Sequence, residues 1–201
     1  MNMILNKYIR PAVVITLLLT VLTGLIYPGI VTALAQLIFP SQANGSLVTV
    51  NGKVVGSDLI GQYWTSARYF HGRPSAALSN DGSKVQPYNA GFSSASNLGP
   101  TNAKLIKNVQ QNIADLKKEN PNAPAGPVPV DLVTTSGSGL DPDISVAAAL
   151  YQVPRVASER GLSESRVHQL VMDNVHGRFL WIFGEPYINV LELNLALDTL
   201  K

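Results

Sequence analysis

The stretch PAVVITLLLTVLTGLIYPGIVTALAQLIF, residues 11–39, decides the fold because none of its 29 side chains is charged. As an α-helix it would extend about 43 Å, whereas the hydrocarbon core of a bilayer is about 30 Å thick. This length predicts a transmembrane helix and argues against a helix buried in a soluble core. Because Pro28 removes a backbone donor, we expect the helix to kink or loosen around Tyr27 and Gly29.

The charges that flank this segment predict its orientation. Lys7 and Arg10 precede it, and the next charged residue is Lys53. Positive charge beside a first span tends to remain in the cytoplasm. We therefore expect residues 1–10 to be cytoplasmic, residues 11–39 to cross the cell membrane once, and residues 40–201 to form an extracytoplasmic domain. The alternative is a cleaved secretory signal, which the small residues Ala33 and Ala35 would suit, although signal cores contain only about 7 to 15 apolar residues.

Thr16, Thr20 and Thr23 recur at helical spacing and share one side of the helix, and Gly29 and Ala33 repeat the four-residue spacing of small residues. Such residues allow close contact between helices in a membrane. They predict a face that packs on another membrane helix, although threonine and glycine are also common in spans without such a role. The candidate packing residues are Thr16, Thr20, Thr23, Gly29 and Ala33.

The composition of the remaining chain excludes several classes of protein. The sequence has 15 basic and 13 acidic residues, and two of the bases, Lys7 and Arg10, lie before the apolar segment. The rest is therefore neutral, which argues against nucleic-acid binding. The sequence contains no cysteine, so disulfides and thiolate-ligated metals are excluded.

The remaining residues predict one mixed α/β domain with a long loop region. Asn51-Gly52 lies between two β-rich runs and predicts a hairpin. Residues 61–99 are rich in turn formers, and their aromatic residues indicate an ordered loop used for contact. We further expect a helix between Asn102 and Asn120 and a buried strand at 130–134. The next helix should start at Asp141, have an irregularity at Pro154 and end at Gly161. A helix from Ser163 and a strand at 187–193 complete the domain.

Patterns that would support catalysis are weak. The glycine-rich turn at 136–139 could hold an anion beside a helix N-terminus, but such glycines more often only permit a turn. Ser138 lacks the G-x-S-x-G frame of a nucleophile elbow. His71, His168 and His176 are widely separated and predict no metal site, and Asp141 and Asp143 lie where helix-capping acids belong.

Several uncommon sequence motifs resemble those of one family, the C subunit of the Kdp potassium-transporting ATPase. The likeness covers essentially the whole chain. The motifs are GQ at 61–62, YFHGRPSA at 69–76, SNLGPTN at 96–102, DLVTTSGSGLDP at 131–142, QVPRVA at 152–157, GEP at 184–186 and NVL at 189–191.

The resemblance implies a non-catalytic accessory subunit of a potassium uptake complex in the cell membrane. Its partners would be a potassium-channel-like subunit, a P-type ATPase subunit and a small single-span subunit. The family is associated with assembly and with raising the pump subunit's affinity for ATP, so the chain would need no cofactor of its own. Gln152 is the residue that the resemblance implies for nucleotide contact. This conflicts with the predicted topology, because ATP is cytoplasmic and the charges place Gln152 outside.

We therefore expect the membrane helix to dock on the channel-like subunit and the exported domain to lie over the outer mouth of the ion pathway. Two alternatives remain open. One is an anchored hydrolase that uses Ser138. The other is a nucleotide-binding chaperone with reversed topology.

Overall fold

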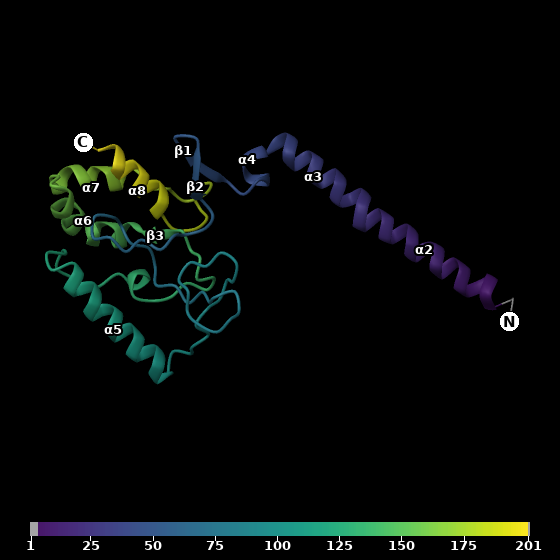
Figure 1. The fold of residues 1–201 in the computed structure, drawn as a ribbon, viewed down its shortest axis with the longest axis horizontal. Coiled ribbons are helices and arrows are strands. Elements are labelled where there is room, and N and C mark those ends of the chain that lie inside the picture. Colours follow the sequence, from purple (N-terminus) through teal and green to yellow (C-terminus); the bar gives the residue numbers. More distant parts are fainter. Residues whose placement is uncertain (1–3, 201) are drawn as a thin grey trace. The chain divides into compact units, whose positions relative to one another are not determined.

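The computed structural model describes residues 4–200, and the chain divides into two compact units, Met1–Leu47 and Val48–Lys201. The first unit is helical (Figure 1). It consists of a π-helical turn at Leu5–Ile9, α2 at Arg10–Val21, a second π-helical turn at Leu22–Ile26, α3 at Tyr27–Ile38 and the short α4 at Pro40–Ala43. Asn6–Ile38 forms a helix of 33 residues with a mean hydropathy of 2.2, long and apolar enough to cross a membrane.

The expected loosening of this helix near Pro28 is confirmed. The Tyr27 N–H donates to the Leu22 carbonyl, five residues earlier, and this is the wide π-helical spacing that directly precedes the proline. Two of the candidate packing residues have hydroxyl groups that bond to the backbone of the same helix. Thr20 Oγ1 donates to Thr16 O at 2.8 Å, and Thr23 Oγ1 donates to Leu19 O at 2.7 Å.

The predicted hairpin is also confirmed. Strand β1 (Leu47–Val50) pairs with β2 (Lys53–Ser57), and the turn residues Asn51 and Gly52 have φ values of 50° and 77°. These left-handed conformations are those of the tight turn that an Asn-Gly pair favours.

A long segment without helices follows β2, as expected. Of its described residues, only isolated pairs such as Leu78 and Val85 form β-bridges. The segment is nevertheless part of the domain, because Phe70 is completely buried. Its backbone also bonds to distant residues, with Gly61 N donating to Leu140 O and Ser94 N to Ser138 O.

The C-terminal half builds the core. Its elements are α5 (Ala103–Glu119), a 3₁₀ turn at Val130–Leu132, β3 (Asp143–Ser145), α6 (Val146–Arg160), α7 (Glu164–Asp173), β4 (Tyr187–Asn189) and α8 (Val190–Thr199). The predicted helix starts are confirmed for α5 and α7, since the side chains of Asn102 and Ser163 accept from Lys104 N and Arg166 N. Gly161 ends α6 in the left-handed conformation, also as predicted.

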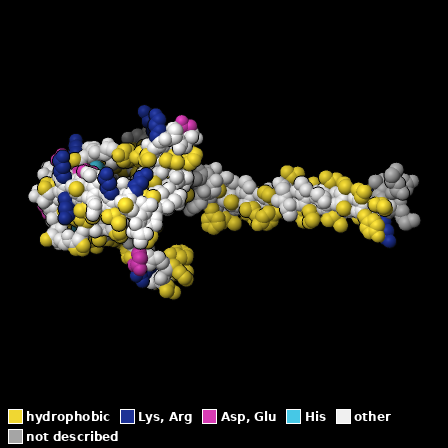
Figure 2. Space-filling view, turned by 90° about the horizontal axis from the view of Figure 1, so that it is seen from below, with side chains coloured by type: hydrophobic (Ala, Val, Ile, Leu, Met, Phe, Trp, Pro, Cys, Tyr) yellow, Lys and Arg dark blue, Asp and Glu magenta, His cyan; other side chains and the backbone are white. Residues whose placement is uncertain are grey.

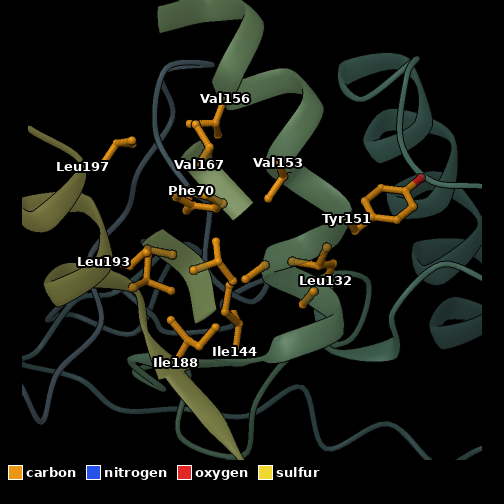
Figure 3. Packing of buried hydrophobic residues seen from close by; sticks show 14 of the residues in the cluster. Phe70, Leu132, Ile144, Tyr151, Val153, Val156, Val167, Ile188, Leu193 and Leu197 are labelled. Atoms are coloured by element: carbon orange, nitrogen blue, oxygen red, sulfur yellow. The ribbon is translucent and has the colours of Figure 1, made fainter. Parts of the chain in front are cut away.

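The core lies where α6, α7 and α8 meet the two-stranded sheet of β3 and β4. Strands β3 and β4 are antiparallel, with Ile144 opposite Ile188. Figure 3 shows the side chains of Val156 on α6, Val167 on α7 and Leu193 on α8 gathered with these isoleucines around Phe70 from the long loop. Burial of such side chains contributes roughly 1.5 to 3 kcal/mol each, so the loop is held by the same core as the helices.

Three local expectations were wrong. Residues 130–134 form no strand, because the N–H groups of Val133 and Thr134 donate back to the Val130 carbonyl. The N-cap of α6 is Ser145 rather than Asp141, since Ser145 Oγ accepts from Ala148 N. The third difference is that the final strand stops at Asn189, whose side chain caps α8. Helix α6 continues through the buried Pro154, as expected.

Candidate functional site

A buried carboxamide on α6 fastens the long loop to the core. Gln152 has no exposed surface. Its Oε1 accepts from His71 N at 2.8 Å and from Arg155 Nη2 at 2.6 Å, while its Nε2 donates to His71 O at 3.1 Å and to Ala148 O at 3.3 Å. A carboxamide has two acceptor and two donor positions, and all four are used here.

A second buried carboxamide repeats this arrangement from α8. Asn194 Oδ1 accepts from Phe70 N at 2.9 Å, and its Nδ2 donates to Phe70 O at 2.9 Å. Asn194 is also completely buried. Two successive peptides of the loop, at Phe70 and His71, are therefore paired with side chains on two different helices, in place of the neighbouring strand that a sheet would supply.

Arg155 extends the network around the loop. Its Nη1 donates to Tyr69 O at 2.9 Å and to the Ala67 carbonyl, and its Nε donates to Asn120 Oδ1 at 2.9 Å. Burial lowers the pKa of Arg155, and the nearby Glu119 carboxylate acts in the opposite direction. This guanidinium is therefore used in internal bonds and is not presented to solvent.

His71 connects the loop to the end of α5. Its Nδ1 lies 3.1 Å from Glu119 Oε1, and its Nε2 lies 3.0 Å from the Ser66 carbonyl. Both partners are acceptors, so the two bonds coexist only when both ring nitrogens carry a hydrogen. The hydrogen bond from His71 is the main cause that lowers the pKa of Glu119.

The glycine-rich turn at 136–139 holds the other end of the loop. Gly139 has a φ of 70°, and a Cβ there would lie 2.7 Å from Ser94 O and 2.8 Å from Ala77 N. Ser75 Oγ donates to Gly139 O at 2.6 Å. Strand β3 separates this turn from the start of α6, so the turn does not lie at the helix N-terminus that an anion site would need.

Asp141 and Asp143 were expected to cap a helix, and this was wrong because that helix starts later. Asp141 instead forms an ion pair with Arg73, with Nη1 and Oδ2 3.0 Å apart. Burial, followed by the neighbouring Asp141 charge, raises the pKa of Asp143 to about 6. Asn189 Nδ2 donates a hydrogen bond to Asp143 Oδ1 at 3.3 Å.

The predicted candidates for catalysis are not brought together. Ser138 Oγ accepts from Leu140 N at 3.1 Å, and no bond recorded among residues 4–200 joins it to a histidine. His71 bonds to Glu119, whereas His176 bonds to Glu192 at 2.8 Å. In this part of the chain no three His, Asp or Glu side chains gather into a metal site.

A cavity of about 370 Å³ lies beside the loop network. Its lining includes His71 and Arg73 together with the carboxylates Asp115 and Glu119. Side chains of both charge signs therefore line the cavity. The carboxylates of Asp115 and Glu119 would repel a polyphosphate. Among the described residues that line the cavity, none is a nucleophile hydrogen-bonded to a base.

Of the residues in this network, Gln152 was a candidate from the sequence, whereas Asn194, Asn120 and Glu119 were not. A signal for Asn194 was present, since it stands directly between Leu193 and Leu195 in the leucine-rich run LELNLALD, residues 191–198, of the last helix. The candidate packing residues Thr16, Thr20, Thr23, Gly29 and Ala33 all lie on the exposed helix of the first unit.

Comparisons with known proteins agree over almost the whole length of the chain. A family model described as "K+-transporting ATPase, c chain" matches residues 9–199. A potassium-transporting ATPase KdpC subunit of Rhodopseudomonas palustris (strain BisB18) is 59% identical over 97% of this chain and 99% of its own length. KdpC subunits of Bradyrhizobium diazoefficiens and Methylobacterium nodulans are each 56% identical over 96% of this chain, and over 96% and 98% of their own lengths.

Proposed function

Because this chain belongs to the KdpC family, the c chain of K+-transporting ATPases, we propose that it is a non-catalytic accessory subunit that assembles with and braces the subunits that move potassium. The observation that carries the bracing role is the double fastening of the loop at Phe70 and His71. These bonds make the loop and the helices one packed body. A body of this kind offers a preformed contact surface, which keeps the entropic cost of association low.

The membrane helix would supply the second contact. We propose that its small-residue face, with Gly29 and Ala33, packs on the channel-like subunit, and that the folded domain lies outside the cell over the mouth of the ion pathway. The apolar helix Asn6–Ile38 supports the membrane attachment. The positions of Lys7 and Arg10 support the orientation.

ATP would reach this chain only through the pump subunit. A nucleotide that contacted Gln152 directly would have to break one of the four bonds of a completely buried side chain. We therefore propose that Gln152 positions the loop, and that any effect on ATP affinity passes through contacts between subunits. The nucleotide-binding chaperone with reversed topology remains the alternative, and it requires the domain to be cytoplasmic.

Two experiments test this function. Because the chain has no cysteine, single cysteines at Asn6 and Asn80 can be labelled from each side of intact membranes. Labelling of position 80 from outside only would support the proposed topology, whereas labelling from the cytoplasm would favour the chaperone. Expression of the complex with the folded domain deleted should abolish assembly or potassium uptake, and unchanged uptake would contradict the proposal.

A further inference from the structure

Five consecutive apolar residues stand in solvent on a short hairpin between α7 and β4. We call residues 179–183 the apolar hairpin. The exposed fractions of their side chains run from 60% for Phe183 to 95% for Trp181. Figure 2 shows hydrophobic side chains gathered in a projection of the folded domain, with acidic and basic side chains where it begins.

The backbone of the apolar hairpin is held in place by its own bonds. Phe179 N donates to Phe183 O and Phe183 N donates to Phe179 O, both at 2.9 Å. Directly outside this pair, Arg178 Nη2 lies 2.7 Å from Glu185 Oε2. The hairpin therefore displays its side chains with its backbone already ordered.

Exposure of this kind is unusual in a protein that has no partner. Contiguous apolar patches on a soluble surface commonly mark interaction sites, and tryptophan is enriched among the residues that dominate binding energy. Trp181 lies at the turn and is not part of the core cluster of the described residues. The apolar hairpin thus has the form of an anchor that enters a pocket.

The charges around the hairpin decide between a lipid surface and a protein pocket. The cavity beside Phe179 and Phe183 is also lined by Asp143 and Glu185. Arg178 and Glu185 neutralise each other as an ion pair and His176 is bonded to Glu192, so the remaining charge of this lining is that of the Asp143 carboxylate. An acidic rim repels the phosphates of a membrane surface, whereas it attracts basic side chains of a protein.

We propose that the apolar hairpin inserts into an apolar pocket with a basic rim on another subunit of the same transporter. This inference rests on the proposed function, because it identifies one of the surfaces through which the accessory subunit would bind. Trp181 would fill the pocket, and the acidic groups around the hairpin would face the rim.

A photoreactive amino acid at position 181 of the full chain, in the purified intact complex, tests the contact. We expect a covalent adduct with another subunit. A matched probe at Ile106, an exposed apolar residue of α5, should give no such adduct. Adducts with lipid only, or no protein adduct from position 181, would overturn the proposal.

Substitutions measure how much the contact matters. Trp181→Ala should lower the recovery of this chain with the complex by about tenfold or more, as expected for a dominant interface residue. Trp181→Phe should retain most of it, and Ile106→Ala should have no effect. If deletion of the whole domain abolishes potassium uptake but Trp181→Ala leaves recovery unchanged, the accessory role stands and the apolar hairpin is not its anchor.

Discussion

The side chain of Gln152 pairs with both polar groups of the His71 backbone, accepting from its N–H at 2.8 Å and donating to its carbonyl at 3.1 Å. A glutamine on a helix thus bonds to the loop as an adjacent strand would. Asn194 does the same for Phe70. The loop has no sheet to join, and these two carboxamides satisfy backbone groups that would otherwise be buried without partners.

Gln152→Ala should destabilise the domain without any nucleotide present. The substitution leaves the backbone groups of His71 and the Nη2 atom of Arg155 without their Gln152 partner, which costs about 3 kcal/mol of unfolding free energy or more. Urea denaturation of the full chain in detergent would measure it. Gln169→Ala is the control, because Gln169 is exposed and should lose less than about 0.5 kcal/mol. Equal stability of the two variants would contradict the positioning role.

Gly139→Ala should weaken the attachment of the loop to the glycine-rich turn. The added Cβ would meet Ser94 O and Ala77 N at less than 3 Å, and the left-handed φ is unfavourable for alanine. A loss of about 1 to 3 kcal/mol is expected in the same denaturation experiment. Gly137→Ala, where a Cβ would meet nothing within 4 Å, is the matched control and should be close to neutral.

Asp143→Asn should stabilise the domain at alkaline pH. Burial raises the pKa of Asp143 from 3.8 to about 6, so the folded state binds this proton more tightly than the unfolded state. The resulting stability is present below pH 3.8 and is lost as the pH rises through 6. The asparagine cannot ionise. The difference in melting temperature, variant minus wild type, should therefore be more positive at pH 8 than at pH 4.

The other charged groups that act on Asp143 are Asp141, His176 and Glu192. Asp115→Asn, at an exposed position of α5, is the control for a general effect of removing one charge. A difference between variant and wild type that is the same at both pH values would show that Asp143 does not titrate in this range.

Gly29→Leu combined with Ala33→Leu should reduce association of the membrane helix with its partner. Larger side chains on the small-residue face would keep the helices apart. The yield of intact complex after purification in detergent would be the measurement. Ala35→Leu enlarges one side chain on a different face of the helix and should leave the yield unchanged. Equal losses from both changes would count against a specific docking face.

Where neighbouring residues alone determine the conformation, the sequence was sufficient. The Asn51-Gly52 turn, the caps at Asn102 and Ser163, and the left-handed end at Gly161 all follow from local chemistry. Residues 130–134 were misread because β-branched side chains also fit a 3₁₀ turn when the backbone bonds close locally.

The apolar hairpin was not recognised as a surface feature. Its letters FLWIF resemble a buried strand, and only the fold shows that these side chains face solvent. The long loop shows the reverse, because its aromatic residues predicted order and Phe70 is buried in the core of its own domain. Apolar composition says that a side chain avoids water, but not whether its own domain or a partner covers it.

By itself, the sequence determined that an uncharged helix of membrane-spanning length precedes a mixed domain without cysteine, and its motifs determined the family. These properties depend on composition and on short-range order along the chain. The tertiary structure decided that Gln152 and Asn194 bond to the loop peptides of His71 and Phe70, which lie 81 and 124 residues away in the sequence. Such pairings exist only once the helices have packed, because burial is what makes an unpaired peptide group costly.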